Sequence, residues 1–406
     1  MPRVLSLSTY PVVQPIHGGQ RRIHAFSQRL VASGWEFVNA SVYDPDHYSG
    51  AAVGPNDLPL RYPGMAWRGL PLVGDLQAGE FAATSPEAYA HFARLVERLA
   101  PDFIQLEQPF LWPLVKRLRA EGVAADTPVI YSSQNWEAPL KHKMLVKAGA
   151  PEAKAREVAE AITALERELS CASAAIVAVS ESDAEHYRAA APDVPVFVVP
   201  NGVSRPVTPT PEDERACDIY EGRKYLLFVG SAYPPNIEGF LHLVLKNGLF
   251  FFPPEKSVAI CGGVSHGIFG NGVYQAQIHA NSRRCQFFAD VSDGELEALK
   301  RGSHAVILPI QFGGGSNLKT AEALASGRWV VATSIAMRGF ERFANAPGVL
   351  VADTPDAFRD AIVKVLASPP LKLTAAQAKA RESVYWDRCF DAAGYIEFFD
   401  RQAVGA

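Results

Sequence analysis

The sequence predicts an α/β protein made of two domains, each a doubly wound parallel sheet. In both halves of the chain, short apolar runs alternate with longer segments that have an amphipathic helical period. A proline-rich stretch at residues 203–214 separates the two halves. In the second half, three consecutive glycines stand between an apolar run and a helical segment. Each half is therefore expected to be a series of strand–helix units with right-handed crossovers.

The first domain is expected at residues 1–202. Its apolar runs have the length of buried strands and lie at 4–8, 103–106, 129–132, 175–179 and 197–199. Helical patterns fall between them, namely one that ends near Gly34 and others at 87–99, 111–120, 139–147 and 152–171. Residues 44–80 are rich in proline, glycine and tyrosine, so an irregular excursion is expected there.

The second domain is expected at residues 215–374, after a linker at 203–214. Six further apolar runs predict its strands, at 225–229, 258–261, 286–288, 305–308, 329–332 and 349–351. The last segment, 375–406, is helical in pattern and carries several aromatic side chains. Such a segment either packs back on the first domain or caps the second, and the sequence leaves both open.

Composition limits the classes of function. The chain has 406 residues and 48% hydrophobic content, enough for two cores, and a net charge of −4, which argues against general nucleic-acid binding. Its five cysteines are dispersed without a CxxC pair, so neither a disulfide framework nor a zinc site is expected. The start lacks the apolar region of a signal peptide, and no apolar run reaches 18 residues. We expect a cytoplasmic protein, and peripheral association with the inner face of the membrane is compatible with the sequence.

The three glycines, 313–315, open the most informative stretch. Backbone N–H groups at Gly315, Ser316, Asn317 and Leu318 would point out of a helix start, where the helix dipole favours an anion. Lys319 adds a cation one turn in. Glu322 lies one turn later on the same face, where a carboxylate suits sugar hydroxyls. The residues predict a nucleotide, with diphosphate on 316–319 and ribose on Glu322; the alternative is a tight turn with a surface ion pair.

Two common phosphate motifs are excluded. A Walker loop needs glycine directly before its lysine, and Leu318 stands there. The glycines of the segment Cys261-Gly262-Gly263-Val264-Ser265-His266-Gly267 do not have the spacing of a dinucleotide fingerprint.

An ordered set of motifs resembles a known family. The set comprises a Gly-Gly loop, Ser132-Ser133-Gln134-Asn135-Trp136-Glu137, Ala178-Val179-Ser180-Glu181-Ser182-Asp183, Val199-Pro200-Asn201-Gly202-Val203, Phe228-Val229-Gly230-Ser231 with Pro235-Asn236, and Glu322-Ala323-Leu324-Ala325-Ser326-Gly327. Over residues 4–368 the chain resembles retaining, nucleotide-sugar-dependent glycosyltransferases of the group 1, family 4-like type. The resemblance implies the GT-B architecture, two Rossmann-like domains facing across a cleft. It implies acceptor binding by the first domain and donor binding by the second.

The resemblance also implies roles for single residues. Gly18 and Gly19 would approach the donor diphosphate, although an ordinary strand–helix turn is the simpler interpretation of these glycines alone. The nucleotide base would meet backbone at 289–291, which includes Val291. Gly230 and Ser231 would border the donor, and the helix after the glycines would bind phosphates and ribose as inferred above.

The chain departs from the family pattern at several positions. Gly314 replaces the first glutamate of a Glu-x7-Glu motif that ends at Glu322. Ser231 and Glu238 stand where many members carry an arginine and a lysine. Gln134, or else Asn135, stands where a histidine is common, and an amide cannot act as a general acid or base.

The chemistry implied by the resemblance tolerates these changes. Retaining transfer in this fold needs no obligatory protein nucleophile, since the leaving diphosphate can accept the acceptor's proton. Lys319 would stabilise the leaving group, and Gln134, Asn135 and Glu107 would orient the partners. Glu107 could equally be a capping carboxylate. No metal and no cofactor are expected, the nucleotide-diphosphate-sugar being the donor substrate.

The acceptor leaves little trace in the sequence. Basic and apolar residues mix at 139–147, and Lys116, Arg117 and Arg119 lie on another helix. Such a surface could dock on an anionic membrane with a lipid-linked sugar, or simply be an amphipathic helix. We expect a hexosyltransferase that uses a UDP- or GDP-sugar and a glycan or lipid-linked acceptor, in polysaccharide or glycoconjugate synthesis. A UDP-sugar epimerase of the same fold and a non-catalytic nucleotide-sugar binder are the alternatives.

Overall fold

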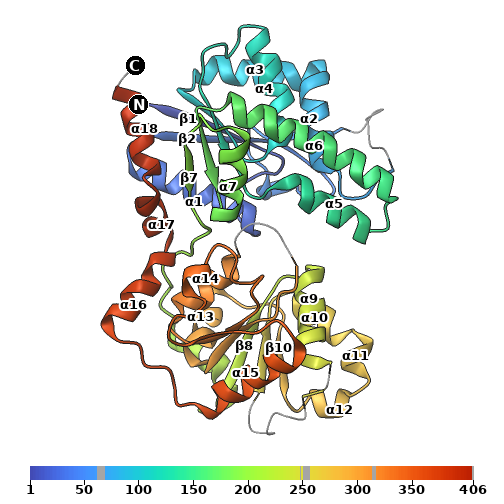
Figure 1. The fold of residues 1–406 in the computed structure, drawn as a ribbon, viewed down its shortest axis with the longest axis vertical. Helices are drawn as coiled ribbons and strands as arrows, with labels where there is room; N and C mark the ends of the chain where they lie inside the picture. The colour runs from blue at the N-terminus through green and yellow to red at the C-terminus, as the bar shows by residue number, and fades with distance from the viewer. Residues whose placement is uncertain (62–68, 247, 250–256, 313–316, 405–406) are drawn as a thin grey trace. The chain divides into compact units, whose positions relative to one another are not determined.

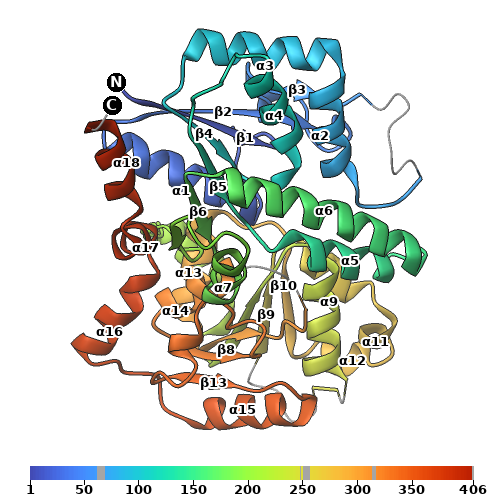
Figure 2. The ribbon, with the colours of Figure 1, turned by 45° about the horizontal axis from the view of Figure 1, so that its top comes forward.

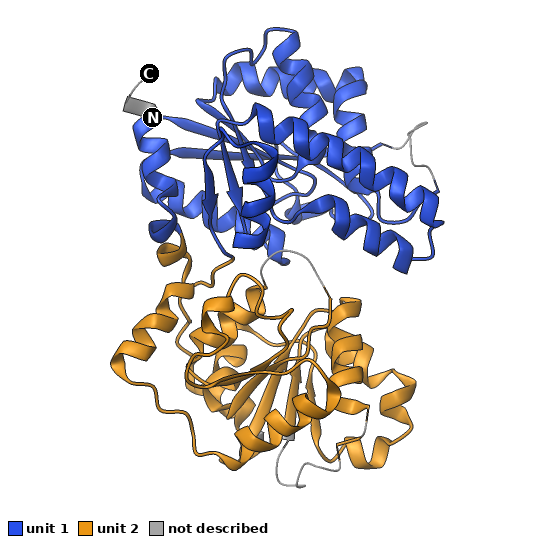
Figure 3. Cartoon of the chain, viewed as in Figure 1, with its two compact units in different colours: residues 1–200, 390–406 blue, residues 201–389 orange. Residues whose placement is uncertain are grey.

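The computed structural model describes residues 1–61, 69–246, 248–249, 257–312 and 317–404 (Figure 1). The chain forms two compact units, each with its own parallel sheet (Figure 3). Unit 1 comprises residues 1–200 and 390–406, and unit 2 comprises residues 201–389. The division falls after Pro200, and the C-terminal segment is shared between the units, because 375–389 belongs to unit 2 and 390–406 to unit 1.

The sheet of unit 1 has the strand order β3-β2-β1-β4-β5-β6-β7, all parallel (Figure 2). Its strands are β1 (Arg3–Ser8), β2 (Glu36–Tyr43), β3 (Leu58–Pro59), β4 (Phe103–Leu106), β5 (Val129–Ser132), β6 (Ala175–Ala178) and β7 (Val196–Val198). The order runs one way from β1 to β3 and the other way from β4 to β7. The doubly wound topology therefore places its switch point between β1 and β4, at whose carboxyl ends ligands bind in such sheets.

Helices cover both faces of this sheet. They are α1 (Gly18–Ala32), α2 (Gly74–Thr84), α3 (Pro86–Leu99), α4 (Trp112–Ala120), α5 (Glu137–Lys147), α6 (Glu152–Ala172), α7 (Glu181–Ala190), the end of α17 (Trp386–Ala393), which begins in unit 2, and α18 (Tyr395–Val404). Leu5 and Leu7 share a face with apolar residues of α2, α3, α4, α6 and α7. On the other side, Phe26 of α1 meets Tyr395 of α18, with ring centroids 5.2 Å apart.

Three elements of unit 1 were missed or misjudged from the sequence. Residues 44–80 are not wholly irregular, because they contain β3 and the start of α2. Strand β2 alternates polar and apolar residues and so has no continuous apolar run. Helix α2 begins without a side-chain cap, and a Cβ on its Gly79 would collide with the carbonyl oxygen of Phe110. Gly79 weakens the helical pattern of the sequence, but α2 needs a glycine there to pack closely against the backbone of Phe110.

The sheet of unit 2 has the order β10-β9-β8-β11-β12-β13, again all parallel. Its strands are β8 (Tyr225–Val229), β9 (Ser257–Cys261), β10 (Cys285–Phe288), β11 (Ala305–Leu308), β12 (Trp329–Ala332) and β13 (Val349–Val351). Its helices include α8 (Pro211–Cys217), α9 (Pro234–Phe240), α10 (Val264–Phe269), α11 (Gly272–Gln275), α12 (Ile278–Asn281), α13 (Asp293–Gly302), α14 (Leu318–Ala325), α15 (Pro355–Ala367) and α16 (Ala375–Arg381). Apolar clusters fill both faces, as a doubly wound sheet requires.

The predicted linker is shorter than expected, because helix α8 starts inside it at Pro211. Thr210 and Asp213 form a capping box there, with Asp213 N–H donating to Thr210 Oγ1. Later in unit 2 the chain returns beside Val203, whose N–H donates to the carbonyl of Val384 at 3.0 Å. In the parts of the chain that the structure describes, no helix has the length and apolarity that crossing a bilayer requires.

Candidate functional site

In unit 2 the predicted phosphate helix is α14. It follows β11 and starts at Leu318, and the side chain of Asn317 caps it by accepting the N–H of Lys319 at 3.1 Å. Gly314, Gly315 and Ser316 lie outside the described residues. The described part of the predicted anion site therefore consists of Asn317, Leu318 and Lys319.

The ammonium of Lys319 reaches across to helix α9, which follows β8. Its Nζ donates to Oδ1 of Asn236 at 2.6 Å, and Nδ2 of Asn236 donates to the carbonyl of Ser231 at 2.9 Å. The structure thus brings Lys319 and Ser231 together through Asn236, which the sequence analysis had quoted only as part of a motif. The two positions where the family resemblance implied cations hold Ser231, in the loop after β8, and Glu238, in α9, and Lys319 of α14 brings a cation to Asn236.

The environment of Lys319 disfavours its charge. Burial lowers the pKa of the Lys319 ammonium to about 8, and the nearby carboxylate of Glu322 offsets part of this effect. The hydrogen-bond partner of Nζ is the neutral side-chain amide of Asn236. A desolvated cation with a neutral partner is suited to an incoming anion.

Glycines bring the loops after β8 and β9 close together. A Cβ on Gly230 would lie 3.3 Å from the side chain of Val264, and Gly262 has a φ of +85° with the Gly230 carbonyl directly beside it. The N–H of Val264 donates to that carbonyl at 3.0 Å. Val291, the residue predicted at the base, lies between β10 and α13, and its side chain packs partly buried against the core.

In unit 1 the glycine loop begins α1 and is packed against Gln134. A Cβ on Gly19 would collide with the Tyr10 hydroxyl and lie 2.5 Å from Gln134 Oε1. The Tyr10 hydroxyl donates to the same Oε1 at 2.6 Å, and burial raises the pKa of Tyr10, so the phenol keeps its proton. Two predicted residues, Gly19 and Gln134, are therefore neighbours, and Tyr10 joins them. Gly18 is the first residue of the helix.

His17 is a further polar residue at this loop that the sequence analysis missed. It is the N-cap of α1: its Nδ1 accepts the N–H of Gln20 at 3.5 Å, and its Nε2 lies 3.1 Å from the Tyr48 hydroxyl. Burial, with help from the charge of Arg21, lowers the pKa of His17 to about 4. The imidazole is therefore neutral at pH 7 and carries its proton on Nε2. A polar residue directly before a helix-starting Gly-Gly was the signal that could have found it.

Glu107 lies in the interior of unit 1. Its side chain is fully buried, and its Oε1 accepts hydrogen bonds from Ser6 Oγ and Gln105 Nε2, both at 2.7 Å. Burial raises the pKa of Glu107, and these hydrogen bonds and the charge of Arg22 counteract the rise. The side chain of Glu107, predicted either to orient the reaction partners or to cap a helix, is thus held by partners in β1 and β4.

Asn135 is held by its neighbours at the carboxyl end of β5. Its Nδ2 donates to Oε1 of Glu137 at 3.1 Å, and its carbonyl accepts the hydroxyls of Ser133 at 2.8 Å and Tyr187 at 3.2 Å. Glu166 of α6 accepts the N–H of Glu137 at 2.9 Å. Burial raises the pKa of Glu137 and of Glu166 to about 7. The segment that carries Gln134 and Asn135 is therefore fixed by hydrogen bonds to side chains of α6 and α7.

Most of the basic residues considered for membrane contact have partners in unit 1. Lys141 is buried and pairs with Asp75 at 2.5 Å. The other paired cations are Lys116 with Glu168, Arg117 with Glu121, and Arg119 with the carbonyl of Thr127. The basic surface expected at 139–147 is thus reduced, since one of its lysines faces the interior.

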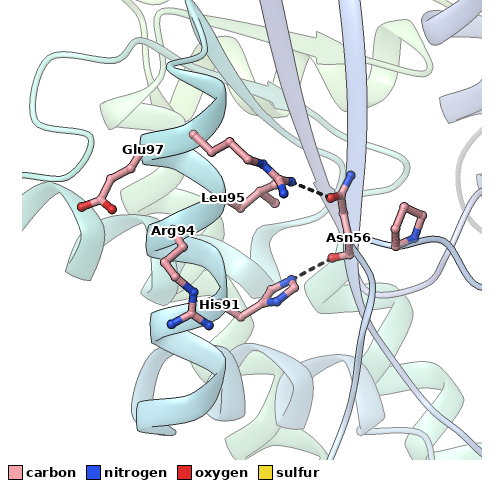
Figure 4. Close-up of a pocket in the computed structure, with 7 residues that line it drawn as sticks. Asn56, His91, Arg94, Leu95 and Glu97 are labelled. Carbon is pink, nitrogen blue, oxygen red and sulfur yellow. Dashed lines mark hydrogen bonds between the residues drawn. The ribbon is translucent and has the colours of Figure 1, made fainter.

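The structure also has an open groove of about 600 Å³ beside α3, apart from the residues above (Figure 4). His91 Nε2 donates to the carbonyl of Asn56 at 3.0 Å, and Arg98 donates to Asn56 Oδ1 at 3.0 Å. These bonds tie the loop before β3 to the helix. None of the predicted site residues lines this groove. Among the described residues, no cluster of three or more histidine, cysteine or carboxylate side chains is arranged to hold a metal ion.

Comparisons with known proteins cover most of the chain. Residues 17–202 match the family model described as a glycosyl transferase 4-like domain, and residues 223–368 match that of glycosyl transferases group 1. A comparison with curated protein sequences gave no match.

Solved structures share the fold over the whole length. Sucrose-phosphate synthase from Thermosynechococcus elongatus gives a TM-score of 0.74 at 13% identity, with 100% of both chains covered. WaaG, a glycosyltransferase involved in lipopolysaccharide biosynthesis, gives 0.59 at 14% identity, covering 97% of this chain and 99% of its own. Anabaena HepE, solved with UDP and glucose, gives 0.59 at 12% identity, covering 100% of this chain and 99% of its own. The two parallel-sheet units have the GT-B fold, and the chain belongs to the group 1, family 4-like glycosyltransferases.

Proposed function

We propose that this glycosyltransferase moves a hexose from a UDP- or GDP-linked donor to a glycan or lipid-linked acceptor, with retention of configuration. Synthesis of a polysaccharide or glycoconjugate is the proposed role. The observation that carries the proposal is the Lys319 ammonium, a partly buried cation with a lowered pKa, beside a helix start and with a neutral hydrogen-bond partner.

A diphosphate fits this position on charge. Its oxygens can accept from the ammonium and from N–H groups at the start of α14, and it brings the negative charge that the neutral Asn236 does not. HepE was solved with UDP and glucose, which supports a nucleotide-sugar as the donor. Glu322, close enough to act on the Lys319 charge, is proposed as the acceptor for ribose hydroxyls.

The proposed transfer takes place on one face of the donor sugar. The bond from the anomeric carbon to the diphosphate oxygen breaks, and the acceptor oxygen bonds to the same carbon on the same face. The leaving diphosphate takes the acceptor's proton, while Lys319 stabilises the negative charge that develops. Gln134 and Asn135 are proposed to orient the acceptor. In this scheme the charge on the leaving group is balanced by protein groups, without a metal or cofactor.

Isothermal titration calorimetry with UDP and GDP tests the donor site. Lys319→Met should weaken binding of the preferred nucleotide by about 30-fold or more, because truncating one partner of a desolvated charge pair costs ~2 kcal/mol or more. Lys372→Met removes an exposed lysine of the same unit and is the matched control.

Two results would contradict the donor site. One is equal affinity of wild type and Lys319→Met. The other is absence of binding by wild type to both nucleotides. Binding without transfer from any nucleotide-sugar, tested with a panel of glycan and lipid-linked acceptors, would instead favour the non-catalytic alternative.

A further inference from the structure

Trp136 is an exposed tryptophan at the carboxyl end of β5. Its relative exposure is 38%, although the ring of His186 on α7 stacks on it with centroids 3.9 Å apart and an interplanar angle of 26°. The imidazole covers one face of the indole, so the exposed surface of the residue lies outside that face. The side chain thus presents a flat apolar surface at the edge of the sheet where ligands bind in this topology.

The start of α5 does not explain a tryptophan at this position. Trp136 is the N-cap of α5, where serine, threonine, aspartate or asparagine is favoured, and its side chain makes no capping hydrogen bond. Glu166 of α6 takes over the capping role: its carboxylate accepts the N–H of Glu137 at 2.9 Å and that of Ala138 at 3.3 Å. Local helix chemistry therefore leaves the indole without a role at the helix start.

The backbone around Trp136 is fixed on both sides. Before it, the carbonyl of Asn135 accepts from Ser133 and Tyr187; after it, Glu166 holds Glu137 and Ala138. With His186 stacked behind, the indole is held in one orientation. A surface that is already ordered loses little conformational entropy when a ligand docks on it.

We propose that Trp136, backed by His186, is the platform on which a pyranose ring of the acceptor stacks. The axial C–H groups of a pyranose carry partial positive charge and suit the electron-rich face of an indole. Its hydroxyl groups, around the ring edge, suit the side-chain amide of Asn135, the residue directly before Trp136. The inference rests on the proposed function, and it names the chemical class of the acceptor at this subsite.

A sugar fits this surface better than a membrane does. Interfacial tryptophans assist membrane docking where cations accompany them. Here Lys141, one turn further along α5, is buried against Asp75. The exposed lysines of α5, Lys143 and Lys147, lie about two and three turns after Trp136 along the helix. The chemistry around the indole therefore favours a neutral polyhydroxylated ring.

Saturation-transfer difference NMR on the full chain tests the platform. The probes are the methyl α- and β-glycosides of glucose, galactose, mannose and N-acetylglucosamine, with UDP in the same sample as an independent report on the donor site. Wild type should transfer saturation to the ring C–H protons of at least one glycoside. Trp136→Ala should reduce that signal about fivefold or more, and Trp136→Phe should retain part of it, because a smaller aromatic face remains.

The matched control is Phe269→Ala, since Phe269 is an exposed aromatic of unit 2 that also packs edge-on against another ring. It should leave the glycoside signals unchanged. The UDP signal should persist in all variants, and circular dichroism should show an unchanged fold.

Three results would overturn the proposal. The first is an unchanged glycoside signal in Trp136→Ala, and the second is no glycoside signal from wild type. The third is a Trp136→Ala variant that still binds glycosides but, unlike wild type, no longer floats with vesicles of phosphatidylcholine and phosphatidylglycerol. The last would make Trp136 a membrane anchor. Absence of a UDP signal from wild type would contradict the donor site but not the Trp136 platform, so failure of one proposal can be told from failure of the other.

Discussion

At the scale of single residues, the Lys319 side chain combines an energetic cost with the role proposed for it in binding the donor diphosphate. Its pKa is lowered from an ordinary value of 10.5 to about 8, because burial disfavours the ammonium. Below pH 8 the folded protein carries this poorly solvated charge, so the group destabilises the fold in the absence of a ligand. Sites that bind charged ligands commonly sacrifice stability in this way.

This cost can be measured as a stability that changes with pH. Between pH 8 and 10.5 the unfolded chain keeps the Lys319 proton while the folded protein releases it, so the stability of wild type rises through this window. Lys319→Met should therefore have a higher midpoint of thermal unfolding than wild type at pH 7, and the difference should shrink between pH 8 and 10.5. A pH series of calorimetric scans checks this; a lower midpoint for the variant at pH 7 would be incompatible with a desolvated charge.

The residue contacts at both candidate sites could not be predicted from the sequence. The Lys319–Asn236 hydrogen bond joins positions 83 residues apart, and the Tyr10–Gln134 bond joins positions 124 residues apart. The sequence could identify lysine, amide and glycine as suitable types. It could not show that Asn236 would accept a hydrogen bond from Lys319 or that Tyr10 would contact Gly19. Such pairs depend on how segments distant in the sequence pack together at the edge of a sheet.

At the scale of elements, strands buried on both faces were predicted well because they are continuous apolar runs. The strands at 103–106, 129–132, 225–229, 305–308 and 329–332 begin and end where the sequence placed them. Strand β2 and helix α2 were not predicted. Strand β2 carries the polar residues Asn39 and Ser41, and helix α2 carries Gly74 and Gly79. Their patterns are set by tertiary packing rather than by local propensity.

The start of α1 provides a test at this scale. Gly19→Ala should destabilise the protein by about 1–3 kcal/mol, because the new Cβ would overlap the Tyr10 hydroxyl and crowd Gln134. Adding Tyr10→Phe should recover part of the loss, since it removes the nearest oxygen. Gly74→Ala at the start of α2, where a Cβ meets nothing within 4 Å, is the control and should be neutral or stabilising. Chemical denaturation of the four proteins measures this, and equal stability of Gly19→Ala and Gly74→Ala would refute the close contact.

At the scale of the whole molecule, helix α1 starts at the glycine loop and contacts the two places where the chain leaves and re-enters unit 1, near residues 200 and 390. Arg22 donates to the carbonyl of Val199 at 2.8 Å, just before the chain leaves the unit. Arg29 pairs with Asp391 at 2.8 Å, just after the chain returns. Phe26 lies between them and packs edge-on against Phe390. The helix that presents Gly18 and Gly19 is thus also the helix that holds the last segment of the chain in place.

The proposed function puts the diphosphate of a nucleotide-sugar donor at Lys319 of unit 2. A crystal structure of the full chain with UDP bound tests this assignment most directly. We predict a diphosphate oxygen within hydrogen-bonding distance of Lys319 Nζ, with the ribose at Glu322. Diphosphate density away from the start of α14, with Lys319 still bonded only to Asn236, would contradict it.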